Sequence, residues 1–156
     1  MLFRSGVDVY NFGMVPTPVM FREAKKYGAG LIITSSHNPL EWNGLKFIIN
    51  GRGPNEKEFA HILKEKQMQQ TEFGTESKVE SKYIDEAARI IGKIKHRPRI
   101  IVDVGGGAAS LVAPQLLRKL GCQVDIINEK STKRGPDPTV DKLTQLVSRK
   151  IGRAHV

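Results

Sequence analysis

The residues most able to take part in a chemical reaction lie in one polar loop between two short apolar runs. The loop holds Thr-Ser-Ser-His-Asn-Pro at residues 34–39 and Asn-Gly-Leu-Lys at residues 43–46. Serine can carry a transferred group, histidine can move a proton near neutral pH, and lysine supplies a fixed positive charge. The adjacent Ser36 and His37 do not form a hydrolase triad by themselves, because no Gly-x-Ser-x-Gly elbow surrounds them. By residue type alone, this segment could equally be an ordinary surface loop or a functional site.

Apolar runs on either side of this loop predict the elements that present it. Residues 19–27 are expected to form a helix that Gly28 closes, and residues 29–34 and 45–49 are expected to be strands. A loop between two strands is a usual place for functional side chains, because the strands hold its base while its tip stays accessible. The predicted fold class is therefore α/β, with mixed sheets flanked by helices.

The charged middle of the chain is predicted to be helical. A helix is expected at residues 56–70, with Phe59, Ile62, Leu63 and Lys66 near one face. A second is expected at residues 81–93, with an apolar stripe of Ile84, Ala87, Ala88 and Ile91. The segment 71–79 between them is polar and is expected to be exposed. Residues 95–98, Lys-His-Arg-Pro, are interpreted as a domain junction.

A second strand, helix and strand follow this junction. Residues 99–104 and 123–127 have the composition of buried strands, and residues 108–120 that of a helix between them. This order predicts a parallel pair of strands with a right-handed crossover. The glycines at 105–107 could cradle a phosphate, but they match neither the dinucleotide fingerprint nor the P-loop. We interpret them as a tight turn, with an anion site as the alternative.

Composition limits the range of partners. The 156 residues carry a formal net charge of +9, but the lysines and arginines form no block and are not interleaved with aromatic residues. We therefore expect neither nucleic acid nor a membrane as a partner. No apolar run reaches the roughly 20 residues that cross a bilayer, the first residues do not read as a signal peptide, and Cys122 is the single cysteine. These features predict a cytoplasmic location.

The order of residues in the loop resembles that of the α-D-phosphohexomutases, the phosphoglucomutases, phosphomannomutases and phosphoglucosamine mutases. The serine loop of that family reads Thr-x-Ser-His-Asn-Pro and is followed by Asn-Gly-x-Lys. This chain fills every position, with Thr34, Ser36, His37, Asn38, Pro39, Asn43, Gly44 and Lys46. Residues 13–18, 101–108 and 134–139 are similar to further family segments in the same order. The resemblance covers residues 6–150 approximately.

This resemblance implies an intramolecular phosphotransferase, an isomerase that interconverts hexose 1-phosphates and 6-phosphates. Ser36 would carry the phosphoryl group and contact Mg²⁺ through its phosphate, His37 would move or orient a proton at the sugar hydroxyl, and Lys46 would neutralise charge. The implied partners are a hexose phosphate substrate and a hexose bisphosphate intermediate. Residues 41–47 favour phosphoglucosamine mutase, with phosphomannomutase/phosphoglucomutase as the alternative.

Several family segments have no counterpart in these 156 residues, among them the Asp-Gly-Asp-x-Asp-Arg loop that supplies the metal-binding aspartates. We therefore expect residues 1–95 to be an N-terminally truncated domain 1 and residues 98–150 to be the start of domain 2, both incomplete. The chain alone is expected to be inactive. Residues 151–156 are interpreted either as translated adapter sequence or as a shortened metal loop. A non-catalytic anion- or nucleotide-binding α/β module and an inert truncated product stay open as alternatives.

Overall fold

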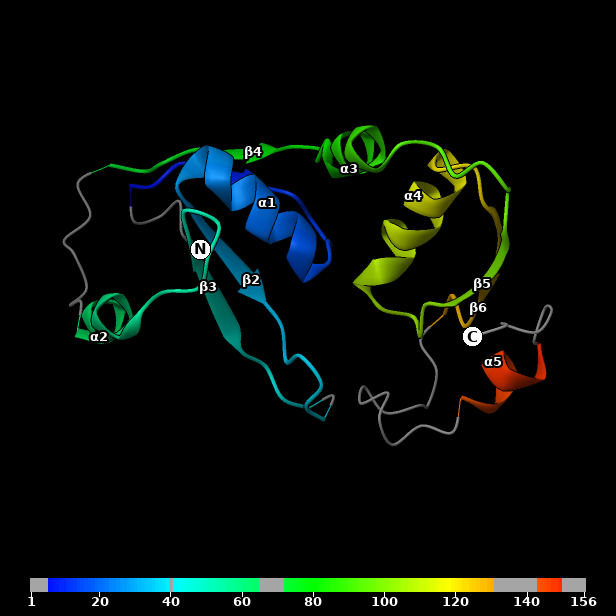
Figure 1. The fold of residues 1–156 in the computed structure, drawn as a ribbon. Coiled ribbons are helices and arrows are strands. Elements are labelled where there is room, and N and C mark those ends of the chain that lie inside the picture. The colour runs from blue at the N-terminus through cyan, green and yellow to red at the C-terminus, as the bar shows by residue number, and fades with distance from the viewer. Residues whose placement is uncertain (1–5, 40, 65–71, 131–142, 150–156) are drawn as a thin grey trace. The chain divides into compact units, whose positions relative to one another are not determined.

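The computed structural model describes residues 6–39, 41–64, 72–130 and 143–149. Figure 1 shows short strands and helices in alternation, which confirms the predicted α/β class. Of the helices in these residues, none has the length and apolar character that crossing a bilayer requires. In chain order the elements are β1 (Val9–Asn11), α1 (Thr17–Tyr27), β2 (Ala29–Ile33), β3 (Leu45–Ile49), α2 (Glu56–Lys64), β4 (Glu76–Lys78), α3 (Tyr83–Ile91), β5 (Arg99–Asp103), the 3-10 helix η2 (Ala108–Leu111), α4 (Ala113–Lys119), β6 (Gln123–Ile127) and α5 (Thr144–Ser148).

Helix α1 forms where it was predicted and begins slightly earlier, at Thr17. Pro18 lies in its first turn, where the missing N–H needs no partner and the fixed φ suits a helix. Gly28 ends the helix with φ of 80°, as predicted. The helix packs closely on β2, because a Cβ atom added at Gly30 would lie 3.0 Å from the Cβ of Ala24. Val19, Ala24 and Ile48 are buried.

Strands β2 and β3 form a hairpin that carries the serine loop at its end. The Thr34 N–H donates to the Gly44 carbonyl over 2.9 Å, and the Asn50 N–H donates to the Gly28 carbonyl over 2.8 Å. Because residue numbers rise on one strand as they fall on the other, the pairing is antiparallel. Both predicted strands are confirmed, with β2 ending one residue early, at Ile33.

The pair β1 and β4 was not predicted. Segment 71–79 was expected to be exposed and polar, and all of β4 is exposed, but it pairs in parallel with β1 from Val9↔Glu76 to Asn11↔Lys78. The Asp8 carboxylate accepts hydrogen bonds from the N–H of Thr75 at 2.9 Å and from its hydroxyl at 2.7 Å. The main-chain bond, and then the hydroxyl bond, hold the pKa of Asp8 below its ordinary value.

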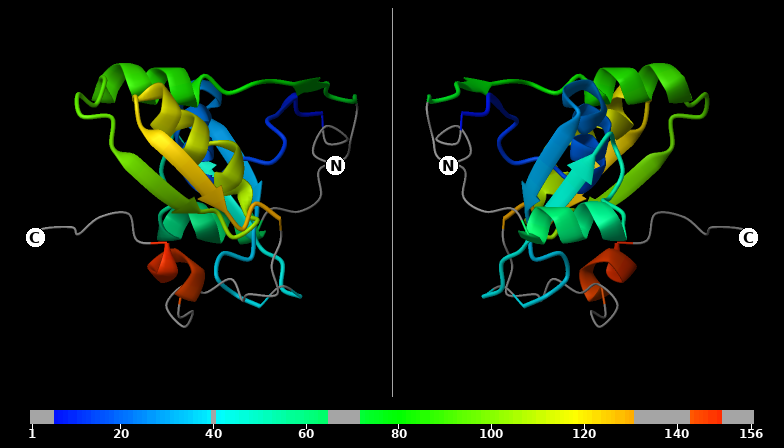
Figure 2. Two further views of the ribbon diagram at one scale, coloured as in Figure 1. Left: turned by 90° about the vertical axis from the view of Figure 1, so that its right-hand side faces the viewer. Right: turned by 90° about the vertical axis from the view of Figure 1, so that its left-hand side faces the viewer.

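Strands β5 and β6 form the predicted parallel pair, in register from Arg99↔Gln123 to Asp103↔Ile127. Figure 2 shows them as neighbouring arrows with α4 against β6. The predicted helix 108–120 is wrong as a single element, because Val112 at φ −121° separates η2 from α4. Pro114 explains this break, since a proline ring inside a continuous helix would clash with the preceding turn but fits a helix's first turn.

Both central helices form where they were predicted, and α3 is shorter than predicted. α3 covers Tyr83–Ile91 and packs on α4, where the Lys119 ammonium forms an ion pair with Asp85. Ile91, expected in the apolar stripe, is 58% exposed. α2 covers Glu56–Lys64, and its predicted continuation to residue 70 lies outside the described residues. Phe59 and Leu63, expected on the apolar face of α2, are exposed.

The chain divides into two compact units. The first contains the segment up to Leu31 and the segment Phe47–Ser81, and the second contains the loop segment Ile32–Lys46 and the chain from Lys82 onward. This division differs from the predicted domains 1–95 and 98–150, because α3 packs on α4 within the second unit. The predicted domain boundaries stay a prediction. The family-like segment 134–139 and the tail 151–156 lie outside the described residues.

Candidate active site in the serine loop

The predicted serine loop emerges from the hairpin as irregular chain and turns. Ser36 and His37 form a turn and are exposed, and neither belongs to a helix, as predicted. The Asn38 N–H donates to the Ser35 carbonyl over 3.0 Å, and the Trp42 N–H donates to the Pro39 carbonyl over 3.0 Å. Two successive hydrogen-bonded turns therefore set the conformation of the loop tip, which is exposed and is not held by burial.

Ser36 has a left-handed backbone conformation, with φ of 58°. A residue with a Cβ atom adopts this conformation at a cost of about 1 kcal/mol or more, and such residues gather at functional sites. The Ser36 N–H donates to the Thr34 hydroxyl oxygen over 3.0 Å, which holds the strained residue in place. Thr34 is thus a positioning residue, and its part could have been inferred from the tendency of threonine to form such local turns.

The Ser36 hydroxyl and the His37 ring meet, with 3.1 Å between Oγ and Nδ1. The sequence alone did not predict this contact, because adjacent side chains usually diverge. The left-handed turn at Ser36 allows it. A hydroxyl beside a ring nitrogen can pass its proton to the ring when its oxygen attacks an electrophile, so this pair suits a serine that gains and loses a group.

Gly44 closes the base of the loop. A Cβ atom at this position would lie 2.9 Å from the Thr34 carbonyl oxygen, which is too close for another residue without movement of the main chain. The same carbonyl belongs to the residue whose side chain holds Ser36. Gly44, which the sequence predicted as loop, therefore has a packing role, since it lets the main chain approach Thr34 closely.

Lys46 is the second residue of β3 and is exposed. Within the described residues, no hydrogen bond or ion pair joins its ammonium group to Ser36 or His37. The structure thus brings together two of the three predicted catalytic residues. The third lies on the returning strand of the same hairpin and is exposed.

The residues of the loop do not by themselves form a magnesium site. Among residues 6–39, 41–64, 72–130 and 143–149, no group of three His, Cys, Asp or Glu side chains converges as metal ligands. Mg²⁺ requires several oxygen ligands in near-octahedral geometry, and a phosphate on Ser36 would supply only part of such a set. The donor set present therefore does not fit a complete metal centre.

The glycine turn after β5 does not present free amides to an anion. The Gly105 N–H donates to the Asp103 carboxylate at 3.2 Å and the Gly106 N–H to the Asn128 carbonyl at 2.8 Å. The third amide, of Gly107, donates to the Val104 carbonyl at 3.0 Å. Because all three donors are used within the fold, the interpretation as a tight turn is favoured over a phosphate cradle.

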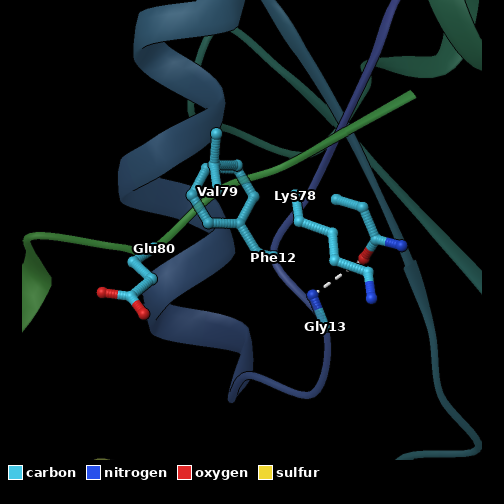
Figure 3. Close-up of a pocket in the computed structure, with 6 residues that line it drawn as sticks. Phe12, Gly13, Lys78, Val79 and Glu80 are labelled. Carbon is cyan, nitrogen blue, oxygen red and sulfur yellow. Dashed lines mark hydrogen bonds between the residues drawn. The ribbon is translucent and has the colours of Figure 1, made fainter. Parts of the chain in front are cut away.

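A pocket of about 450 Å³, whose lining includes no residue of the serine loop, lies at the carboxyl ends of β1 and β4. It is lined by Asn11, Phe12, Gly13, Lys78, Val79 and Glu80 (Figure 3). The Asn11 side-chain oxygen accepts from the Gly13 N–H at 2.8 Å, which fixes one wall. Lys78 and Glu80 extend to different sides in Figure 3, so the pocket does not concentrate charge of one sign.

Comparison with known proteins identifies relatives along nearly the whole chain. Residues 1–74 match the family described as phosphoglucomutase/phosphomannomutase, alpha/beta/alpha domain I. A phosphoglucosamine mutase of Methanococcus maripaludis is 33% identical and a probable one of Methanobrevibacter smithii is 30% identical, each over 94% of this chain and 36% of the relative. A probable phosphoglucosamine mutase of Thermococcus kodakarensis is 36% identical over 81% of this chain and 30% of the relative.

A solved structure agrees with these relatives. A phosphoglucomutase/phosphomannomutase family protein of Burkholderia thailandensis has a TM-score of 0.69 and 28% identity, over 94% of this chain and 36% of its own. The chain thus spans about a third of the length of the relatives that it matches. The domain match, the relatives and the shared fold agree with the residues of the serine loop, and the chain belongs to the phosphoglucomutase/phosphomannomutase family.

Proposed function

We propose that Ser36 is the phosphoryl carrier of a phosphohexomutase and that the substrate is a glucosamine phosphate. The observation that carries this proposal is the left-handed Ser36, whose hydroxyl lies 3.1 Å from the His37 ring. The names of the curated relatives support glucosamine as the sugar. The alternative substrates within the family are mannose and glucose phosphates, in keeping with the family description.

The proposed reaction has two transfers through Ser36. In the first, the bond between phosphorus and the serine oxygen breaks as phosphorus bonds to a sugar hydroxyl oxygen, and the proton of that hydroxyl passes by way of His37 to the serine oxygen. The product is a hexose bisphosphate, which turns and presents its other phosphate. In the second transfer that phosphate returns to the Ser36 oxygen, and the sugar is released as the isomeric monophosphate.

His37 is proposed to handle the proton in these transfers. When the serine oxygen attacks phosphorus, its proton passes to Nδ1 of His37, and this proton is then available to the departing sugar oxygen. Lys46 is proposed to supply a positive charge that neutralises the phosphoryl oxygens. Mg²⁺ is proposed as the cofactor, with its further ligands supplied from outside the described residues. A cytoplasmic location is part of the same proposal.

The non-catalytic anion-binding alternative receives less support from the structure. It depended on the glycine turn at residues 105–107, whose three amides all have partners within the fold. The phosphoserine proposal, in contrast, is supported by an exposed hydroxyl with a ring nitrogen beside it, and the serine loop has both.

The test is a chimera in which this chain replaces the matching 36% of the Methanobrevibacter smithii relative. We expect the chimera to isomerise glucosamine phosphate faster than mannose or glucose phosphate, and to show a phosphate on Ser36 by mass spectrometry. Ser36→Ala should abolish both signals, whereas Ser35→Ala, the matched control, should retain them. Lys46→Ala should keep the phosphoserine and lower the rate by a factor on the order of 10²–10³. Full turnover in Ser36→Ala would refute the proposal.

A further inference from the structure

Glu41 and Trp42 are neighbouring residues of the serine loop, and both have exposed side chains. Trp42 is the single tryptophan of the chain and is 60% exposed. Among the residues that the structure describes, neither side chain takes part in a hydrogen bond, an ion pair or an aromatic contact. A lone exposed apolar ring is common on protein surfaces, so the position of Trp42 and the chemistry of its neighbour must decide whether it has a role.

The hydrogen bond at the base of the loop places Trp42 across the loop from Ser36. At this base the Thr34 N–H donates to the Gly44 carbonyl over 2.9 Å. Ser36 lies two residues beyond this bond on the outgoing arm and Trp42 two residues beyond it on the returning arm, so each is at most about 7 Å of chain away from it. The Trp42 N–H donates to the Pro39 carbonyl over 3.0 Å, which fixes the main chain that carries the ring. A hexose held by its phosphate at Ser36 is therefore within reach of the indole.

Glu41 has the one acidic side chain of the loop, residues 34–46. A carboxylate close to a bound phosphate repels it, and on an exposed loop water and salt screen this repulsion only in part. The acid therefore weakens the binding of a phosphosugar unless another part of the sugar is positively charged. A cationic substituent on the sugar would turn this unfavourable charge into a favourable one.

A carboxylate beside an aromatic ring is suited to the recognition of an ammonium group. The face of tryptophan attracts a cation within about 6 Å of the ring centre, and a carboxylate accepts a charge-assisted hydrogen bond from it. Glucosamine phosphates have an amine at C2, where glucose and mannose phosphates have a hydroxyl. Amines of this kind, like the α-amino group, titrate near about pH 8, so most of the amine is cationic at pH 7.

We propose that Glu41 and Trp42 form a subsite for the C2 ammonium group of the amino sugar and thereby select glucosamine phosphates over glucose and mannose phosphates. This inference rests on the proposed function of Ser36 as the phosphoryl carrier. It also fixes an orientation, because C2 is bonded directly to C1 and lies across the ring from the carbon that bears C6. The ammonium group occupies the subsite when O1 of the sugar faces Ser36, and points away from the subsite when O6 does.

The test follows the discharge of phosphate from Ser36 in the chimera at pH 7, by rapid quenching and mass spectrometry. Glucosamine 6-phosphate accepts the phosphoryl group at O1, and glucosamine 1-phosphate accepts it at O6. In Glu41→Gln and in Trp42→Leu, we expect the rate with glucosamine 6-phosphate to fall about tenfold relative to the rate with glucose 6-phosphate. It should fall by a similar factor relative to the rate with glucosamine 1-phosphate.

Conservative variants are the matched controls. Glu41→Asp keeps the carboxylate and Trp42→Tyr keeps an aromatic face, so both should retain most of the preference for glucosamine 6-phosphate. Circular dichroism verifies folding, and Glu41→Gln alone decides if Trp42→Leu does not fold. Equal slowing with all three sugar phosphates would overturn the subsite while Ser36 still carries phosphate. A chimera that acquires no phosphate on Ser36 would instead overturn the proposed function, and this inference with it.

Discussion

At the scale of single residues, the serine loop combines a reactive group with a strained backbone. Ser36 is left-handed although it has a Cβ atom, and its amide is held by the Thr34 hydroxyl. The conformation that costs stability is the one that places the Ser36 hydroxyl beside His37. These contacts agree with the proposed roles of Ser36 as the phosphoryl carrier, His37 as its proton partner and Thr34 as a positioning residue.

Thr34→Val should separate the role of Thr34 from that of Ser36. Valine keeps the shape of threonine but removes the oxygen that accepts from the Ser36 N–H, so Ser36 should leave its left-handed conformation part of the time. In the chimera we expect a fall in rate on the order of tenfold. Thr34→Ser keeps the oxygen and should stay near the wild-type rate. Equal rates for the two variants would contradict a positioning role.

Ser36→Gly and Ser36→Ala should differ in stability although both lack the carrier oxygen. Glycine adopts positive φ without steric cost, and alanine does not. The free energy of unfolding of the glycine variant should therefore be about 1 kcal/mol higher than that of the alanine variant. Urea denaturation of the 156-residue chain measures the difference. The same pair of substitutions at Ser35, which is not among the residues with positive φ, should show no gain for glycine.

At the scale of elements, α2 depends on its N-terminal cap because none of its residues is buried. The Asn55 side chain accepts from the Glu58 N–H at 2.9 Å, and the Glu58 carboxylate accepts from the Asn55 N–H at 2.7 Å, which makes a reciprocal capping box. Arg52 adds two hydrogen bonds of 2.7 Å to the same carboxylate. One carboxylate therefore joins the preceding turn to the first turn of the helix.

The stability of α2 should depend on the ionisation of Glu58. The hydrogen bonds from Arg52, followed by that from the Asn55 amide, lower the pKa of Glu58 from 4.5 to about 2. Because the folded carboxylate holds its proton less tightly than the unfolded one, the stabilisation is complete above about pH 4.5 and is lost as the pH falls toward 2.

Amide exchange in α2 measured between pH 6 and pH 2 tests this dependence, after correction for the intrinsic pH effect on exchange. Protection of α2 should fall in that window in the wild-type chain and should change much less in Glu58→Gln, which cannot lose the charge. Asn55→Ala, which removes the cap oxygen, should destabilise α2 by about 1 kcal/mol at neutral pH. A protection profile in wild type that matches the glutamine variant would contradict the assignment.

At the scale of the whole molecule, the candidate active site lies on an exposed hairpin loop and is not enclosed by other described residues. Ser36 and His37 are exposed, and the pocket at the ends of β1 and β4 does not include them. The chain covers about a third of its relatives, so we propose that the remaining groups of the site come from segments like those that complete the relatives. The net charge of +9 suits an anionic phosphosugar, which is the proposed substrate.

Removal of divalent metal should not alter the 156-residue chain. Since its described residues converge on no three metal-ligating side chains, we expect equal melting temperatures with millimolar Mg²⁺ and with EDTA. The phosphoryl transfer of the chimera, in contrast, should stop with EDTA and return with Mg²⁺. A rise in the melting temperature of the isolated chain with Mg²⁺ that Ser36→Ala abolishes would show that the loop holds more of the metal than we propose.

The local sequence determined the hairpin, its loop and the C-terminal end of α1, and the three-dimensional structure decided which groups meet. Apolar runs and breakers such as Gly28 act over a few residues, so β2, β3, β5 and β6 could be predicted from composition and order. The resemblance of the loop identified Ser36 and His37, but their contact at 3.1 Å depends on the φ of Ser36, which residue types do not encode. The β1 and β4 pair could not be predicted, because the polar strand Glu76–Lys78 has no apolar alternation and its partner lies more than 60 residues away. The position of Trp42 across the loop from Ser36 likewise depends on the pairing of Thr34 with Gly44, since the register of a hairpin is fixed by the length and geometry of its loop.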